Sequence, residues 1–296
     1  MPVDWSLLFP KSLIPVRVVF IFLMMWCVPV MAVRADSLPR YYAPSVNQTG
    51  MIGLNMVPTA RLDEKGTVRI GVAADDPYGH GFLGFQLATP FYVNLRQTAH
   101  ISSLRGPAKN LYPGIDFKLR LWEETATRPA MVLGMDSAFG HKRTASEYFS
   151  FSKRLSHFDV TAGIAWGRLG SEGHIKNPLR TIVPHFDRDR DVTSDLPNDA
   201  RDWFTGEEVG FFGGIEYFTP LKGLSVKADY GANDYSGEKT INGFDAPSPW
   251  SIALNYQPEF SFGRSIALSI GTIGAEKIMG RLSIQGQAPD WPIRSW

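Results

Sequence analysis

The sequence predicts an all-β protein, an antiparallel transmembrane β-barrel of about 12 strands of the outer-membrane type. Three observations predict this fold: strict alternation of apolar and polar residues, repetition of that pattern with no helix-period stretch between, and connections that alternate between short and long. Each alternating segment alone is a weak signal, and the prediction depends on their repetition along the chain.

The clearest strand is Gly114–Trp122. Apolar side chains alternate there with charged ones, in the order Ile115, Asp116, Phe117, Lys118, Leu119, Arg120 and Leu121. Successive side chains of a strand point to opposite faces, so one face is apolar and the other is charged. A soluble sheet would bury the apolar face under a second layer, and no helical segment supplies one. A closed barrel with lipid outside and a polar lumen explains the pattern, and a soluble periplasmic β-sandwich is the architectural alternative.

Similar segments recur along the chain. The predicted strands lie near 67–74, 82–89, 91–100, 114–122, 130–136, 147–154, 158–168, 208–218, 224–231, 250–257, 264–271 and 277–286. Most connections at one end are short, at 89–90, 123–129, 155–157, 219–223 and 257–263, whereas those at the other end are mostly longer, at 101–113, 137–146, 169–207 and 232–249. Outer-membrane barrels have short periplasmic turns and longer outer loops, so this sorting predicts the orientation.

Aromatic residues mark the predicted strand ends. Phe91, Trp122, Phe158, Tyr217 and Tyr256 are expected at the periplasmic edge, and Trp166, Tyr230 and Trp250 at the outer edge. Such rings favour the membrane–water boundary, although aromatic residues can equally close a hydrophobic core.

The N-terminal residues 1–35 are predicted to be a signal peptide. Lys11 and Arg17 precede an apolar run, Val18–Val33, and small residues follow. We expect cleavage after Ala35, or else after Ala32, and an uncleaved anchor is the alternative.

Cys27, the single cysteine of the chain, falls within the apolar run. Trp26 precedes it where a lipobox needs a small residue, which argues against a lipoprotein. The processed chain would then have no disulfide and no thiol nucleophile. Residues 36–66 are expected to form a periplasmic arm or partial plug, residues 67–286 the barrel, and residues 287–296 a C-terminal tail.

Composition and motifs argue against several functions. The net charge is +1 and no basic run is present, so no nucleic-acid partner is expected. The acidic loop with Asp187, Asp189, Asp191 and Asp195 has Val192 and Asn198 where an EF-hand needs glycine and glutamate, so no metal is predicted. No catalytic or nucleotide-binding motif is found. We therefore expect no enzymatic activity and no cofactor.

Charged residues on the polar faces of the strands are the candidate functional set. They are Arg69, Arg96, Asp116, Lys118, Arg120, Glu216, Lys227, Asp229 and Arg281. A basic residue facing lipid near the midplane would cost about 2–4 kcal/mol, so they should line the lumen. They either pair across strands and fill the barrel or line a conduit for a polar polymer. Tyr92 and Tyr148 could likewise stack on sugar rings or serve in packing.

Several segments resemble one known family. They are G-L-N-M-V-P-T-A-R (Gly53–Arg61), P-G-I-D-F-K-L-R-L-W-E-E (Pro113–Glu124), S-E-Y-F-S-F-S-K (Ser146–Lys153), F-D-V-T-A-G-I-A-W-G-R-L-G (Phe158–Gly170), K-N-P-L (Lys176–Leu179), F-G-G-I-E-Y-F-T-P-L-K-G-L-S-V-K-A-D-Y (Phe212–Tyr230) and N-D-Y-S (Asn233–Ser236). In this order they resemble the YjbH family of outer-membrane proteins associated with exopolysaccharide and capsule production. The resemblance covers nearly the whole processed chain.

The resemblance implies a β-barrel in the outer membrane of a Gram-negative bacterium that takes part in polysaccharide export. It implies no enzymatic activity, and no catalytic or ligand residue is carried over. Family members continue beyond the point where this chain stops, so we expect a shortened member, or one piece of a split gene, that corresponds to their first-barrel region.

The functional hypothesis is therefore binding or passage of an exopolysaccharide at the outer membrane. The expected partners are the exopolysaccharide chain, outer-membrane lipids, and periplasmic or outer-membrane polysaccharide-export proteins. The alternative is a general or structural barrel, porin-like, with no polysaccharide specificity. An outer-membrane enzyme would need a clustered acid–base or nucleophile set, which the sequence does not indicate.

Overall fold

The computed structural model describes residues 43–101, 110–240, 244–245, 247–261, 264–274 and 276–288. The predicted signal peptide with Cys27 and its cleavage sites, residues 36–42 of the arm and residues 289–296 of the tail lie outside the described residues. What the sequence predicts for these segments is therefore not tested by the structure.

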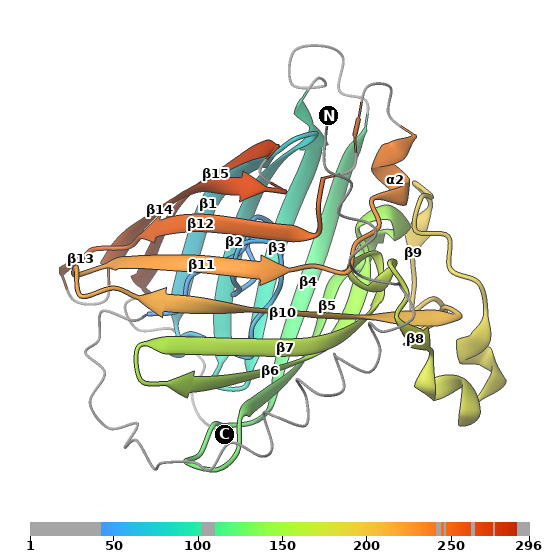
Figure 1. The fold of residues 1–296 in the computed structure, drawn as a ribbon, viewed down its shortest axis with the longest axis horizontal. Helices are drawn as coiled ribbons and strands as arrows, with labels where there is room; N and C mark the ends of the chain where they lie inside the picture. Colours follow the sequence, from blue (N-terminus) through green and yellow to red (C-terminus); the bar gives the residue numbers. More distant parts are fainter. Residues whose placement is uncertain are drawn as a thin grey trace, which may run out of the picture.

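Twelve of the described strands form a closed antiparallel barrel (Figure 1). They are β1 (Thr67–Asp75), β2 (Tyr78–Ala88), β3 (Phe91–His100), β4 (Leu111–Trp122), β5 (Ala130–His141), β6 (Ser146–Leu155), β7 (Phe158–Gly167), β10 (Glu208–Phe218), β11 (Leu224–Tyr230), β12 (Trp250–Tyr256), β14 (Arg264–Ile273) and β15 (Lys277–Gln287). The ring closes because β1 pairs with β15 as well as with β2, and β10 joins β7 to β11. The predicted antiparallel barrel is confirmed.

Short helices and strands lie at one end of the barrel. They are η6 (Lys142–Thr144), η7 (Arg168–Gly170), β8 (Ile175–Lys176), η8 (Pro178–Thr181), η9 (Pro184–Asp187), β9 (Pro197–Asn198) and α2 (Ser236–Lys239). At the opposite end β13 (Glu259–Ser261) pairs with β14. Among the described residues, no helix is both long and apolar enough to cross a bilayer.

Several strands extend further than predicted, and β2 and β5 do so most. β2 begins at Tyr78 and not near residue 82, because Gly79, His80 and Gly81 pair with β3 although glycines weaken the strand signal. β5 continues to His141, where Gly140 and His141 pair with β9.

The two faces of the barrel wall differ as the alternation predicts. On β14, Leu268 is 53% exposed, whereas Ser269 beside it is 2% exposed and points inward. Exposed apolar residues recur on the outer face of β1, β3, β4, β10, β12, β14 and β15: Ile70, Val72, Leu95, Leu119, Ile215, Ile252, Leu254, Ile266, Ile270, Leu282 and Ile284. We call this set the apolar belt, and such an outer surface is typical of a barrel surrounded by lipid.

Trp166 does not lie at the outer aromatic edge where the sequence predicted it. It is only 2% exposed, and its indole N–H donates to Asn177 Oδ1 at 3.0 Å under the long loop after β7. Trp250, at 61% exposed, does lie on the outer surface. Position at a strand end therefore does not decide whether a ring faces the membrane boundary, because a long loop can fold over it.

Candidate functional site: the barrel lumen

Residues 43–63, which we call the inner segment, lie inside the barrel (blue in Figure 1). The inner segment is folded by its own backbone contacts, with isolated bridges between Val46 and Ile52 and between Gly53 and Pro58. The Asn47 side chain accepts the amide N–H groups of Thr49 and Met51 at 3.0 Å each. Gly50 has a positive φ of 89° and lies against the Phe82 ring, where a Cβ would come within 2.4 Å of a ring carbon. Local turn chemistry thus gives the segment a defined shape.

Apolar side chains pack the inner segment against one part of the wall. Leu54, Val57 and Ala60 share a buried cluster with Tyr148 and Phe212. In a second cluster Val46, Met51, Ile52 and Leu62 contact Phe82 and Tyr92. Tyr92 and Tyr148 are both fully buried, and the Tyr92 hydroxyl donates to Gly50 O at 3.0 Å. Of the two roles weighed for these tyrosines, the structure shows packing.

Two wall lysines bind backbone carbonyl groups of the inner segment. Lys118 Nζ donates to Ile52 O and, at 2.9 Å, to Thr59 O. Lys227 Nζ donates to Gly53 O at 3.1 Å, to Leu54 O at 3.2 Å and to the Ser45 hydroxyl. Both side chains are fully buried, so these bonds satisfy donors that would otherwise be costly to desolvate.

The carboxylate of Asp229 accepts hydrogen bonds from the backbone of the same part of the inner segment. One carboxylate oxygen, Oδ2, accepts the amide N–H groups of Asn55 and Met56 at 2.8 Å and of Val57 at 3.2 Å. Ser251, on β12, donates to the other oxygen. A carboxylate that accepts several backbone N–H groups forms charge-assisted bonds, which are stronger than neutral ones.

Two arginine pairs hold the end of the inner segment. Arg69 on β1 makes two bonds to the Asp63 carboxylate, at 2.6 and 2.7 Å. Arg61, from the segment itself, bonds Asp159 on β7 at 2.7 and 2.8 Å and Glu124 at 2.6 Å. Burial would lower the pKa of Arg61, but these two carboxylates outweigh burial and hold its pKa above the ordinary value. The guanidinium therefore stays charged.

The other predicted lumen residues contact only the wall. Arg96 pairs with Asp116 at 3.1 Å, and Glu216 accepts the Ser225 hydroxyl at 2.6 Å. Arg281 donates to Asn255 Oδ1 at 3.0 Å. Arg120 is the exception, because it pairs with Glu123 at a strand end at 2.6 Å and its side chain is 19% exposed. Eight of the nine candidates are therefore buried inside the barrel, and four of these contact the inner segment.

Sequence reasoning missed the partners of these charges. Arg61 and Asp63 belong to the inner segment, which was expected to be an arm or a partial plug and gave no charge pattern of its own. Asp159 lies on the predicted polar face of its strand, opposite Val160 in the alternation, and could have been found by that signal. The backbone acceptors of Lys118 and Lys227 have no sequence signature.

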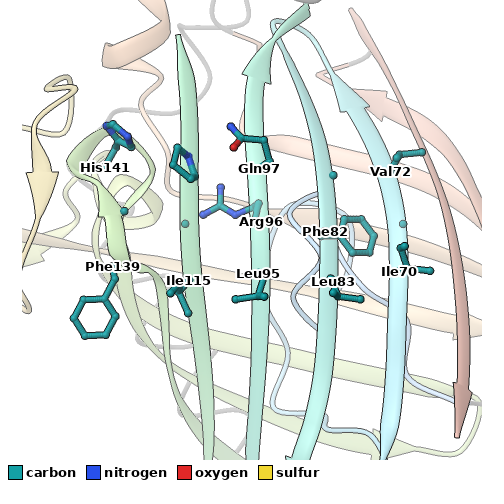
Figure 2. Close-up of a pocket in the computed structure, with 15 residues that line it drawn as sticks. Ile70, Val72, Phe82, Leu83, Leu95, Arg96, Gln97, Ile115, Phe139 and His141 are labelled. Carbon is teal, nitrogen blue, oxygen red and sulfur yellow. The ribbon is translucent and has the colours of Figure 1, made fainter. Parts of the chain in front are cut away.

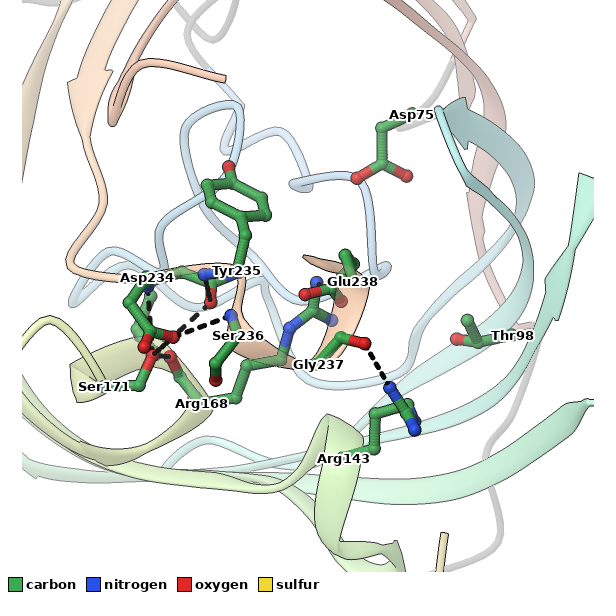
Figure 3. Close-up of polar contacts among 12 residues, drawn as sticks. Asp75, Thr98, Arg143, Arg168, Ser171, Asp234, Tyr235, Ser236, Gly237 and Glu238 are labelled. Carbon is green, nitrogen blue, oxygen red and sulfur yellow. Dashed lines mark hydrogen bonds and ion pairs between the residues drawn. The ribbon is translucent and has the colours of Figure 1, made fainter. Parts of the chain in front are cut away.

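A loop folds over the mouth at the long-loop end of the barrel (Figure 3). Glu238 on α2 pairs with Arg168 at 2.8 Å, and Arg143 donates to Gly237 O at 2.8 Å. Ser171 donates to Asp234 at 2.8 Å. Burial would lower the pKa of Arg168, but Glu238 raises it above the ordinary value. Specific polar contacts thus hold this loop at the long-loop end of the barrel.

The acidic stretch of the long loop is held by contacts within the protein. Asp187 pairs with Arg180 at 3.1 Å, Asp195 with Arg143 at 2.6 Å, and Asp191 accepts from Thr193. In the part of the chain that the structure describes, no group of three or more His, Cys, Asp or Glu residues is placed to hold a metal ion.

A groove of about 860 Å³ lies on the outward side of β1–β5 (Figure 2). Ile70, Leu83, Leu95, Ile115 and Phe139 line it, with Gln97 and His141 at one end. Ile70, Val72 and Leu95 belong both to the groove and to the apolar belt, so the groove is part of the apolar outer surface.

The profile of the YjbH family, described as "Exopolysaccharide biosynthesis protein YbjH", matches residues 45–292. This chain belongs to the YjbH family. It is 32% identical over 212 residues to a protein of Escherichia coli (strain K12) named "Uncharacterized lipoprotein YjbH". The match covers 69% of this chain and 30% of that relative, so the chain spans less than a third of the relative's length. The resemblance read from the sequence is confirmed.

Two solved porins match this chain with low identity and TM-scores below 0.5. The "KdgM porin" is 9% identical with a TM-score of 0.41, and the match covers 75% of this chain and 99% of that one. The "NanC porin" is 8% identical with a TM-score of 0.40 over the same shares. The assignment of the barrel depends on the strand pairing described above.

Proposed function

We propose that this chain is an outer-membrane barrel that takes part in export or assembly of an exopolysaccharide, with no covalent step. Membership of the YjbH family links it to exopolysaccharide. The apolar belt and closed ring of strands support a place in a bilayer, because every backbone group of such a barrel is paired within the wall. Its partners would be the polymer and polysaccharide-export proteins on the periplasmic side.

The inner segment is the observation that carries the mechanism. Lys118, Lys227 and Asp229 bind its backbone, so these wall groups are occupied in the structure. A polymer can use the same groups only after the segment has moved. The structure is then the closed state of a conduit, and displacement of residues 43–63 exposes donors and acceptors suited to sugar hydroxyl groups.

A reversible cross-link tests this mechanism. The amide of Ala60 donates to Ser152 Oγ at 2.8 Å, so cysteines at these positions would join the inner segment to β6. We would express A60C/S152C in a C27A background in a strain that lacks the native gene. Oxidation should sharply reduce secreted polymer, and reduction should restore it.

Single-cysteine variants and the deletion strain serve as controls for the cross-linking experiment. The single variants A60C and S152C should secrete polymer equally with and without oxidant. Unchanged polymer in the deletion strain would contradict a role in exopolysaccharide production. Full secretion by the oxidised double variant would contradict passage through the lumen.

The alternative function is a structural barrel with no polysaccharide specificity. The extent of fixed contacts between the inner segment and the wall favours it, since eight of the candidate charged residues are buried. Under this alternative, deletion would change the permeability of the outer membrane to small dyes and leave secreted polymer at the wild-type level.

A further inference from the structure

One part of the lumen wall carries polar residues that do not bind the inner segment, and we call it the polar track. It consists of inward-facing residues on or next to β12, β14 and β15: Asn255, Gln257, Ser265, Ser269, Arg281, Ser283 and Gln285. Arg281 is the single charged member. The others offer hydroxyl and amide groups, which can both donate and accept hydrogen bonds.

Arg281 is buried without a carboxylate partner. It is 2% exposed, and its one hydrogen bond runs from Nη2 to Asn255 Oδ1. Its Nε and Nη1 groups have no partner, and neither does Gln257 Oε1. Among the described residues, no carboxylate lies within 4.0 Å of the Arg281 guanidinium. Buried polar groups are nearly always paired, so these free donors indicate a site for an acceptor.

Other arginines inside the barrel show the contrast. Arg69 has Asp63 at 2.6 Å, and Arg96 has Asp116 at 3.1 Å. Three charged groups act electrostatically on Arg281, and each has another partner: Arg69 pairs with Asp63, Glu216 accepts from Ser225, and Lys227 donates to the inner segment. Across the ladder, Arg281 faces Ser269 on β14 and Ala73 on β1, neither of which is charged.

We propose that Arg281 and the polar track form a binding site for an acidic saccharide. The free N–H groups of Arg281 would bind the carboxylate of a uronic-acid unit, while Asn, Gln and Ser side chains would bind its hydroxyl groups. A guanidinium suits a carboxylate better than an ammonium does, because its donors are planar and fixed. The inference rests on the proposed function and adds the chemical class of the polymer.

Direct binding tests the site independently of secretion. The probes are trigalacturonate and its fully methyl-esterified form, which differ only in carboxylate charge. Calorimetry would use the detergent-solubilised wild type and Asp229→Asn, in which the inner segment is less firmly held. We expect at least tenfold tighter binding of the acid than of the ester in one or both proteins.

Substitutions test whether Arg281 causes the tighter binding of the acid than of the ester. Arg281→Gln should abolish the difference between acid and ester, and Arg281→Lys should keep part of it. Arg128→Gln, on an exposed turn, is the matched control and should keep all of it. Heat-modifiable migration on a gel would show that each variant is folded. The proposal is overturned if acid and ester bind alike, if neither protein binds the acid, or if Arg281→Gln keeps the preference.

The two proposals fail separately. Loss of polymer in the deletion strain together with an unchanged preference in Arg281→Gln would remove only the saccharide site. Normal polymer in the deletion strain would remove the export role, whatever the calorimetry shows.

Discussion

The two parts of the lumen wall use polar residues in different ways. From β1 through β11, charged and aromatic side chains contact the inner segment, as Arg69, Lys118 and Asp229 show. From β12 through β15, the contacts with the segment that the described residues show are a hydrogen bond to Ser251 and an apolar cluster around Met279, which packs against Met56. The polar track on these strands carries Arg281, whose Nε and Nη1 groups have no partner. Charged side chains inside one barrel can therefore either hold an inner segment in place or keep donors free for a ligand. Only the hydrogen-bond partners of each side chain distinguish these two roles.

Among the wall residues that contact the inner segment, Asp229→Asn is expected to have the largest effect on stability. The change removes an ionised acceptor of three backbone N–H groups and leaves Glu216, the cross-strand partner of Lys227, as the carboxylate near that lysine. We expect a loss of about 2–4 kcal/mol in the free energy of unfolding, because breaking a buried charged network is strongly destabilising. Urea unfolding in lipid vesicles measures it, together with faster proteolysis within residues 43–63. Asp191→Asn, on an exposed loop, should change little, and equal stability of the two variants would show that Asp229 does not fasten the segment.

A pair of adjacent substitutions tests the outer face against the lumen. Leu268→Lys places a charge on the apolar belt and should cost about 2–4 kcal/mol if that position lies near the bilayer midplane. Ser269→Ala, one residue along the chain on the inner face, should cost less than about 1 kcal/mol. The same vesicle unfolding assay compares them. Similar costs would contradict a belt in contact with lipid.

Arg61→Gln should have a smaller effect than Asp229→Asn. Arg61 joins the inner segment to Asp159 and Glu124, but its side chain is 18% exposed, so water can partly replace the lost bonds. We expect a loss of about 1–3 kcal/mol, in the range for hydrogen bonds to charged groups. Cleavage by trypsin near the segment should also increase. If Arg61→Gln costs more than Asp229→Asn, the segment is held mainly at its end.

The smallest effect concerns pH and the long loop. His174 Nδ1 accepts the Phe211 amide at 2.8 Å, and burial lowers the pKa of His174 below its ordinary value of 6.5. The unfolded chain then binds a proton more readily, so stability is complete above the ordinary pKa and falls as pH drops below it. His174→Gln should reduce the loss of stability between pH 7.5 and pH 5.5, and His157→Gln, on an exposed turn, should not. An unchanged pH dependence in His174→Gln would exclude this group.

The wall could be predicted from the sequence because its signal is local. Alternation on Gly114–Trp122 places Asp116 and Lys118 inside and Leu119 outside, and burial agrees. Arg120 is less buried than the other candidates because its strand ends nearby, where Glu123 is within reach. The alternation predicts whether a side chain points inward or outward, but it does not predict how far that side chain lies from the end of the barrel.

The contents of the lumen could not be predicted in the same way. Lys118 and Lys227 bind carbonyl oxygens of the inner segment, and a backbone acceptor has no signature in the sequence. The fit of Gly50 against Phe82 likewise depends on two residues that are distant along the chain. Arg281 matches Arg69 and Arg96 by sequence pattern, and only the three-dimensional contacts show that it bonds Asn255 and no carboxylate among the described residues.

Conductance in a planar bilayer tests the central claim most directly, namely that the wall charges hold residues 43–63 as a closure of the lumen. We expect the wild type and oxidised A60C/S152C to conduct little, and Asp229→Asn to open more often. A large, steady conductance of the wild type that is unchanged by the cross-link would contradict the account.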